Sequence, residues 1–187
     1  MTTWTLDTAH TQINFSAKHM MVTTVRGTFH DVEGTIELDE ADPTRSRGEF
    51  RVATASVDTN FAARDTHLRS ADFFDAETYP FITFRSTAIR QTGDDAFEVT
   101  GDLTIRDITR PATFEVELDG IVKGMSGARH AGLTARGKIA RDDWGLNWNV
   151  PLEGGGWLVG KDIKLEIAVA ADEVAVVEGA EVAVSAS

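Results

Sequence analysis

Four polar residues on a short helical segment offer the most direct chemistry in this sequence. Arg64 and His67 are suited to holding the headgroup of a ligand at the mouth of a cavity. Asp65 and Arg69, spaced i, i+4, can pair with one another. The cluster of Arg64, Asp65 and His67 can instead fix the helical segment to the rest of the fold by ion pairs and hydrogen bonds. The residue types leave both interpretations open.

The same segment also carries an apolar face. Phe61, Arg64 and Leu68 lie at i, i+3 and i+7, so a helix would place them on one side. Thr59 or Asn60 can cap the start of this helix. Because Arg64 borders apolar surface, it needs a partner, either a protein carboxylate or a ligand.

Other motifs for chemistry are weak. Residues 155–161, GGWLVGK, have the spacing of a phosphate-binding loop, but Asp162 stands where a hydroxyl should bind magnesium, and a strand pattern follows instead of a helix. The five histidines form no i, i+4 pair and no H-E-x-x-H motif, so they predict no zinc site. The sequence has no cysteine and no G-x-S-x-G elbow. We expect no catalytic residue, no metal and no required cofactor.

Alternation of apolar and polar residues dominates the remaining chain and predicts at least eight strands. The pattern is clear in residues 12–17, 97–105, 112–118 and 163–169, where every second side chain is apolar. Ile82, Phe84, Ser86 and Ala88 are expected on one face of another strand. After Phe50 and Val52 the apolar parity switches to Ala53, Ala55 and Val57, which predicts a bulge or a strand buried on both faces.

Short turns between these strands predict an all-β, antiparallel sheet that must close or split to protect its edges. We favour a barrel, because a sandwich gives no reason for a helix between strands. Gly101 and Gly137 lie within strand patterns and predict sharp bending where the sheet closes. An eight-stranded barrel is either just packed or wide enough for one ligand, and periodicity does not choose between these states.

Length and charge set further limits. A chain of 187 residues suits one domain. A net charge of −12 predicts a surface that repels nucleic acid and anionic membranes, so we expect no nucleic-acid partner. No apolar run is long enough to span a bilayer, and the first residues, MTTWTLDTAH, have no leader pattern. A cytoplasmic location is therefore expected.

Five segments in this order carry a resemblance to a known family: WTLDTAHTQINFSAKHM (4–20), VRGTF (25–29), RDTHLRSADFFDAETYPFITF (64–84), GDLTIRDITRPATFEVE (101–117) and ARDDWGLNWN (140–149). Together they resemble the YceI-like family of lipocalin-like, polyisoprenoid-binding proteins. The resemblance implies a single extended antiparallel eight-stranded lipocalin-like barrel with a short helical insert around residues 60–76. A long internal tunnel would hold an isoprenoid or another long-chain amphiphile.

The resemblance also divides the chain. Residues 1–170 would form the YceI-like barrel domain, and residues 171–187 an acidic C-terminal extension that is partly ordered or flexible. Members of the family often pair, so a homodimer is a further expectation.

We therefore predict a non-catalytic binding or carrier protein for a polyisoprenoid, an isoprenoid quinone or a fatty-acid-like lipid. The alternatives are an enzyme that acts on such a lipid, with His67 or a carboxylate as acid or base, and a ligand-free stress-response or interaction module. The insert would act as a lid, with Phe73 among its apolar residues. The predicted ligand-binding residues are Phe15, His19, Phe50, Phe61, Arg64, Asp65, His67, Leu68, Phe74, Phe84, Phe97, Phe114, Trp144 and Trp148.

Overall fold

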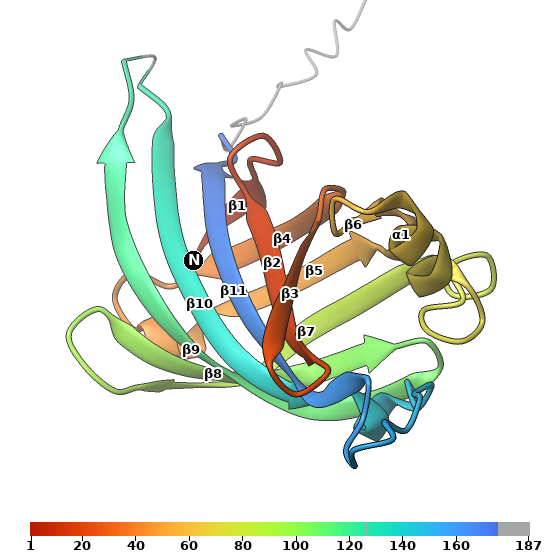
Figure 1. The fold of residues 1–187 in the computed structure, drawn as a ribbon. Coiled ribbons are helices and arrows are strands. Elements are labelled where there is room, and N and C mark those ends of the chain that lie inside the picture. Colours follow the sequence, from red (N-terminus) through yellow and green to blue (C-terminus); the bar gives the residue numbers. More distant parts are fainter. Residues whose placement is uncertain (126, 176–187) are drawn as a thin grey trace, which may run out of the picture.

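The computed structural model describes residues 1–125 and 127–175, which form an antiparallel β-barrel with one α-helix (Figure 1). The helix is α1 (Ala62–Arg69), and three 3₁₀ turns are η1 (Pro43–Arg45), η2 (Thr54–Ser56) and η3 (Arg141–Trp144). The strands are β1 (Thr2–Leu6), β2 (Gln12–His19), β3 (Thr23–Phe29), β4 (Val32–Leu38), β5 (Arg47–Ala53), β6 (Val57–Asp58), β7 (Phe81–Gln91), β8 (Ala96–Ile105), β9 (Ile108–Lys123), β10 (Arg129–Ala140) and β11 (Val159–Glu173).

Three of the barrel's long strands are interrupted, and this explains why a barrel of eight positions contains more strand elements. β1 and β2 follow one another along β11, which pairs with both. In the same way β3 continues into β4, and β5 continues into β6, as their shared neighbours show. Each long strand pairs with its neighbour in the chain, and the β1–β11 pair closes the ring. The predicted eight-stranded antiparallel barrel is confirmed.

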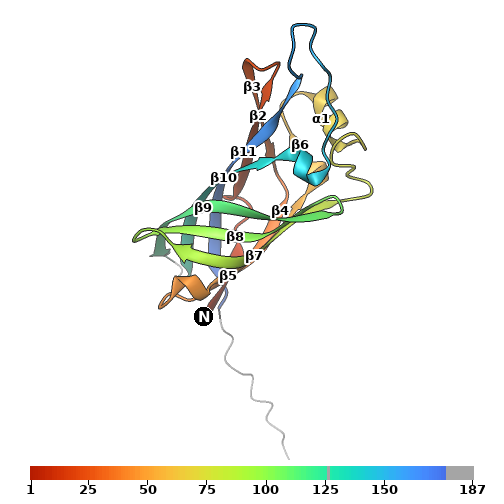
Figure 2. The ribbon, with the colours of Figure 1, turned by 90° about the horizontal axis from the view of Figure 1, so that it is seen from below.

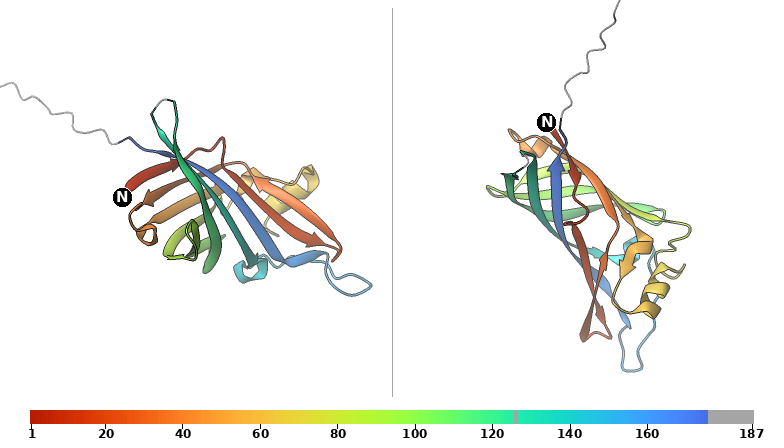
Figure 3. Two further views of the ribbon diagram at one scale, coloured as in Figure 1. Left: turned by 90° about the vertical axis from the view of Figure 1, so that its left-hand side faces the viewer. Right: turned by 90° about the horizontal axis from the view of Figure 1, so that it is seen from above.

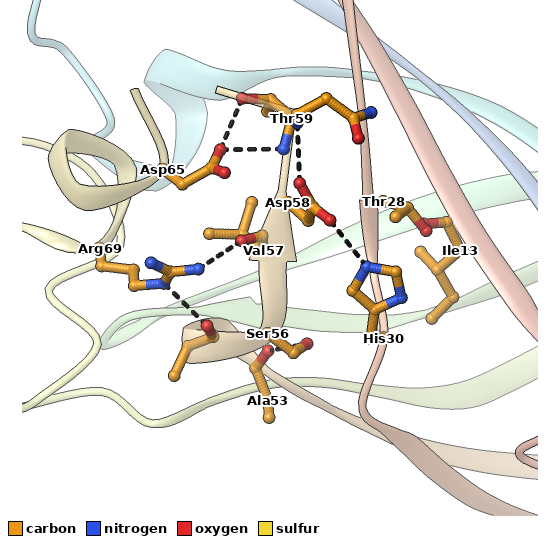
Figure 4. A network of polar contacts seen from close by, with 12 residues as sticks. Ile13, Thr28, His30, Ala53, Ser56, Val57, Asp58, Thr59, Asp65 and Arg69 are labelled. Carbon is orange, nitrogen blue, oxygen red and sulfur yellow. Dashed lines mark hydrogen bonds and ion pairs between the residues drawn. The ribbon is translucent and has the colours of Figure 1, made fainter. Parts of the chain in front are cut away.

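Helix α1 stands beside β6, where a strand partner is missing. β7 pairs with β5 from Phe81 to Arg85, whereas the pairings of the described strands give β6 no partner other than β3. The Arg69 guanidinium donates instead to the carbonyls of Ala55 and Val57, at 2.8 and 2.7 Å (Figure 4). Because an unpaired edge carbonyl costs free energy when it is shielded from water, this arginine replaces part of the missing strand.

Local details differ from three sequence predictions. The parity switch after β5 arises from η2, a 3₁₀ turn between β5 and β6, and not from a bulge or a doubly buried strand. The helix starts after Phe61, which makes no side-chain capping bond, so the predicted caps Thr59 and Asn60 are wrong. A register shift after Ser86 turns Ala88 outward.

The last strand extends past the predicted domain boundary at residue 170. β11 runs to Glu173, and its residues from Ala171 onward pair with β1. Ala171 is buried beside Trp4, so residues 171–173 belong to the barrel. The predicted extension from residue 176 onward lies outside the described residues.

The two ends of the barrel differ in what they carry. Figures 2 and 3 show α1, the β2–β3 hairpin tip and the loop before β11 at one end, away from the N-terminus. We call this the α1 end. The opposite end carries the start of β1, the end of β11 and the β9–β10 hairpin. No helix in the described part of the chain is long and apolar enough to cross a membrane.

Candidate functional site

The barrel encloses a cavity of about 760 Å³, which lies in the range of small-molecule binding sites. The interior is therefore not filled by side chains, a question that periodicity left open. Every second residue of the long strands faces the cavity. On β8 and β11 these lining residues are Phe97, Val99, Leu103, Ile105, Val159, Ile163, Leu165, Ile167 and Val169.

The cavity is long. Its lining includes Val159 and Val169 of β11, and at about 3.3 Å per residue the strand between them covers about 30 Å. Phe61 and Leu158 line it at the α1 end, and Glu40 lines it near the β4–β5 connection. A cavity of this length and apolar lining suits an extended hydrocarbon chain better than a compact molecule.

Phenylalanines on the wall lie against glycines of the neighbouring strand. A Cβ on Gly34 would be 2.6 Å from Cδ1 of Phe50, and a Cβ on Gly137 would be 2.5 Å from Cδ1 of Phe114. Phe15 and Phe84 lie equally close to Gly27 and Gly101. The glycines thus give the rings room against the wall, which leaves the middle of the barrel open. The sequence predicted that Gly101 and Gly137 allow the strands to bend. The contacts show instead that they allow the rings of Phe84 and Phe114 to approach the backbone closely.

One face of α1 closes over the cavity. Phe61, Arg64 and Leu68 all line it, in agreement with their helical spacing. Arg64 donates from Nε to Thr59 Oγ1 at 2.7 Å and from a terminal nitrogen to the Thr59 carbonyl at 3.0 Å. Its guanidinium also lies 5.5 Å from the Phe61 ring. Among the described residues Arg64 forms no ion pair with a carboxylate, so its charge is available to a ligand.

His67 joins α1 to the loop that follows η3. Its Nε2 lies 2.7 Å from Oδ2 of Asp72. Its ring contacts Phe73 and Trp148 edge-on, with centroids 5.1 and 4.5 Å away. His67, Phe73 and Trp148 all line the cavity. This aromatic group fixes the imidazole at the α1 end of the tunnel.

Two predicted site residues lie outside the lining. Asp65 is buried and accepts hydrogen bonds from the Thr59 amide at 2.9 Å and the Thr59 hydroxyl at 2.5 Å (Figure 4). Trp144 is buried in the wall, and its indole donates to the Leu103 carbonyl at 2.9 Å. Both hold the fold together, so the structure does not place them at the site. Asp65 bonds to Thr59 and Arg69 to strand carbonyls, so their predicted mutual pair is also wrong.

The remaining predicted residues all line the cavity: Phe15, His19, Phe50, Phe61, Arg64, His67, Leu68, Phe74, Phe84, Phe97, Phe114 and Trp148. They come from strands and turns on all sides of the barrel, which brings together residues up to 133 positions apart in sequence, from 15 to 148. Whether they contact a ligand remains a prediction.

Sequence reasoning missed three cations in the lining, Lys18, Arg47 and Arg141. Arg141 is buried and donates to carbonyls of the following loop and of β11, including Gly160 at 3.0 Å and Trp148 at 3.0 Å. Burial lowers the pKa of the Arg141 guanidinium, and the nearby Asp142 carboxylate opposes that shift. Arg141 falls within the segment 140–149 that carries the family resemblance, which was the available signal.

Near the opposite end of the tunnel, Trp4 packs behind Ile36, Leu38 and Ile121, which line the cavity. Trp4 is 1% exposed and shares its strand face with Leu6, which lines the cavity. Above it Arg129 pairs with both carboxylate oxygens of Glu40, at 2.8 and 2.7 Å. The hydrogen bonds from Arg129 lower the pKa of Glu40, and the same bonds raise the pKa of Arg129. Arg129 and Glu40 thus satisfy each other's charge, while the exposed Arg47 at the start of β5 also lines the cavity at this end.

The weaker motifs take structural positions. Gly155 and Gly156 of the GGWLVGK segment lie in a loop that leads into β11, Gly160 lies within β11, and Lys161 pairs with Asp142 at 2.9 Å. Gly155 and Gly156 have positive φ angles of 88°. Within residues 1–125 and 127–175, no three His, Cys, Asp or Glu side chains are arranged to hold a metal ion.

Comparison with known proteins agrees with this architecture. A family model described as the YceI-like domain matches residues 4–171. A UPF0312 protein of Staphylococcus aureus (strain N315) is 38% identical over 167 residues, which cover 89% of this chain and 95% of that protein.

Solved structures are similar over most of their length. The Campylobacter jejuni YCEI protein is 32% identical, with a TM-score of 0.73, covering 91% of this chain and 97% of that one. BcnA of Burkholderia cenocepacia is 22% identical with a TM-score of 0.77, covering 88% and 98%. A polyisoprenoid binding domain from Saccharophagus degradans is 13% identical with a TM-score of 0.67, covering 93% and 100%. The last two likenesses concern the fold alone.

Proposed function

The chain belongs to the YceI-like family, and from this premise we propose that it is a binding protein that holds a long-chain amphiphile in its tunnel without transforming it. The observation that carries the proposal is the apolar cavity of about 760 Å³ that extends along the barrel. A polyisoprenoid, an isoprenoid quinone or a fatty-acid-like lipid has the matching shape and chemistry.

Apolar burial supplies the driving force for such a ligand. Each CH₂ group removed from water contributes about 0.8 kcal/mol, so a long chain gains affinity along its whole length. The Saccharophagus degradans domain with the same fold is described as polyisoprenoid binding. Its identity to this chain is 13%, so the ligand class rests on the cavity and on family membership.

The polar groups favour one orientation of the ligand. Arg64, His67 and Lys18 line the α1 end, whereas at the opposite end Arg129 and Glu40 satisfy each other and Arg47 lines the cavity. A headgroup rich in hydrogen-bond acceptors, such as a phosphate or a quinone carbonyl, would contact Arg64. The chain would then extend toward Trp4.

One observation favours an enzyme as the second candidate. Asp72 lies 2.7 Å from His67, an arrangement that can orient an imidazole for acid–base chemistry at the α1 end. Replacing His67 with Asn separates the two functions. A binding protein would keep its lipid and show no turnover before or after the substitution, whereas an enzyme would lose turnover. An open cavity also speaks against a packed, ligand-free module.

Native mass spectrometry of the purified protein tests the proposal directly. We expect a mass shift that disappears after solvent extraction, with the extract containing a long-chain amphiphile. Delipidated protein should then bind an added isoprenoid quinone with one-to-one stoichiometry. A protein that carries no lipid and binds neither a quinone, a polyisoprenyl phosphate nor a fatty acid would refute the proposed function.

A further inference from the structure

Large apolar side chains are exposed around the α1 end of the tunnel. Val22 is 77% exposed, Phe61 59% and Trp157 54%, although all three are residues that folding usually shields. They come from the β2–β3 hairpin tip, from the residue before α1 and from the loop before β11. We call the full set the apolar rim, and it consists of Met20, Met21, Val22, Phe61, Val150 and Trp157.

Backbone contacts join the hairpin and the loop into one surface. The Met20 amide donates to the Leu158 carbonyl at 2.8 Å, and the Leu158 amide donates to the Val150 carbonyl at 2.9 Å. Met21 lies over Gly156, since a Cβ added to Gly156 would be 3.2 Å from the sulfur of Met21. Figures 2 and 3 show both segments at the same end of the barrel as α1.

The apolar rim borders the tunnel itself. Phe61 belongs to the rim and also lines the cavity. Leu158, which accepts the hydrogen bond from Met20, lines it as well. A chain that enters or leaves at this end therefore has to cross the rim.

The backbone at the hairpin tip is strained at Met20 and Met21. Met20 and Met21 have φ angles of 50° and 66°, and the Val22 amide donates to the His19 carbonyl at 3.2 Å. These signs of φ are those of a type I′ turn, for which Asn-Gly is the preferred sequence. Bulky side chains with positive φ are strained, and such strain is typical of functional positions. Local stability therefore does not explain the two methionines at this turn.

Charge favours a lipid surface as the partner. The chain has 30 acidic residues, yet residues 8–30, which include the whole hairpin, contain none. Lys18 and Arg26 lie on this hairpin, and Lys18 lines the cavity together with Arg64. The repulsion expected from a net charge of −12 is therefore reduced at the hairpin part of the rim, where Lys18 and Arg26 can reach lipid phosphates, while Glu153 lies in the loop that carries Val150 and Trp157.

We propose that the apolar rim inserts into the interfacial layer of a phospholipid bilayer, so that a lipid chain passes between the bilayer and the tunnel without crossing water. Tryptophan and phenylalanine side chains, here Trp157 and Phe61, suit the boundary between headgroups and acyl chains. The purpose of this docking rests on the proposed function. The exposed rim, the strained turn and the local charge are observations that hold independently of it.

Vesicle flotation tests the docking. Wild-type protein should float with phosphatidylcholine vesicles, and the double variant M20N/M21G should partition about tenfold less or weaker still, because two large apolar side chains are lost. Asn-Gly is the favoured sequence for this turn, so the variant should unfold at the same or a higher temperature. Loss of flotation in a fully folded variant is the supporting result. Equal flotation of the variant and the wild type would overturn the docking.

A matched control removes apolar exposure at the opposite end. Val122 is 64% exposed and Met125 is fully exposed in the β9–β10 hairpin, and neither lines the cavity. V122N/M125N should float like the wild type. If this variant loses flotation to the same extent as M20N/M21G, binding is not specific to the rim and the proposal is wrong.

Two further readouts separate this inference from the proposed function and from self-association. A wild type that carries lipid but never floats would overturn the docking and leave lipid binding intact. A wild type that floats but binds no lipid would support the docking and refute the proposed function. Light scattering tests self-association. If the wild type is a dimer, M20N/M21G is a monomer and neither protein floats, the rim binds a second copy of the chain and the proposed bilayer docking is wrong.

Discussion

Phe114 and Gly137 face each other across β9 and β10, and the ring occupies the space that a side chain at position 137 would need. A Cβ there would be 2.5 Å from Cδ1 of Phe114, closer than real Cβ atoms approach. The tunnel therefore keeps its width at this point because residue 137 has no Cβ methyl group that would push the Phe114 ring inward. Comparable pairs involve Phe15, Phe50 and Phe84.

Substituting Gly137→Ala should push the Phe114 ring into the tunnel. We expect a loss of about 1–3 kcal/mol in unfolding free energy, as for other overpacked cores, and weaker binding of long chains. Urea denaturation and quinone titration measure the two effects. Gly132→Ala in the same strand is the control, because its nearest neighbour would be at 3.6 Å, an ordinary contact. Equal behaviour of the two variants would contradict the role of the Phe114–Gly137 pair.

Substituting Arg64→Gln should weaken binding of a lipid with a phosphate or quinone headgroup. A hydrogen bond to a charged group contributes about 1.5–3 kcal/mol, which corresponds to about tenfold to a hundredfold in affinity. A plain hydrocarbon of equal length should bind both proteins alike. Arg90→Gln is the control, since Arg90 is exposed and pairs with Glu98 on the outer surface. Equal loss of affinity for headgroup and hydrocarbon ligands would show that Arg64 acts only through the fold.

Substituting Asp65→Ala should destabilise the barrel by about 1–3 kcal/mol, because the Thr59 amide and hydroxyl lose their buried acceptor. Urea denaturation measures the loss. At temperatures where the variant is folded, its affinity for quinone should stay near that of the wild type. Asp102→Ala, at an exposed position of β8, should leave stability unchanged. A stable D65A protein with reduced affinity would place Asp65 at the site after all.

Acid should loosen the end of the barrel opposite α1. Because Arg129 lowers the pKa of Glu40, the pair stabilises the fold fully above the ordinary carboxyl pKa, and this contribution is lost as pH falls through the lowered value. NMR titration of the Glu40 carboxyl should give a pKa below 4.5, the model-compound value, that rises in Arg129→Gln. Arg85→Gln, which removes the exposed pair with Glu49, should leave that titration unchanged. If the pKa of Glu40 is the same in Arg129→Gln as in the wild type, Arg129 is not the cause of its lowering.

Period-two patterning predicted the barrel well, since each strand has one face toward the tunnel and one toward solvent. It failed where the backbone departs from a regular strand. Ile89 lines the cavity in place of Ala88, because a register shift after Ser86 reverses the alternation. The turn η2 breaks β5 from β6 in a way that apolar spacing alone does not reveal.

Residues that line the cavity were predictable where helical spacing or aromatic character determined them, as for Phe61 and Leu68. Trp144 shows the limit of this reasoning, because an aromatic side chain fits equally well into the wall or the tunnel. Its indole found a carbonyl partner in Leu103, which no local pattern encodes. Arg69 was expected to pair with Asp65, but it donates to the carbonyls of Ala55 and Val57, which lie 14 and 12 residues earlier in the chain.

Strand-to-strand hydrogen bonds close the barrel between β1 and β11. Beside β6, among the described strands, they are missing on one side, and α1 takes the place of the strand partner. Local opening of α1 therefore breaks a few side-chain bonds, such as those of Arg69, and leaves the strand ladder intact. Amide hydrogen exchange should accordingly be faster in α1, residues 62–69, than in β8 to β10. If a chain enters past α1, a bound ligand should slow exchange in the former region most. The barrel would then admit its guest through a local fluctuation while most of its backbone stays protected.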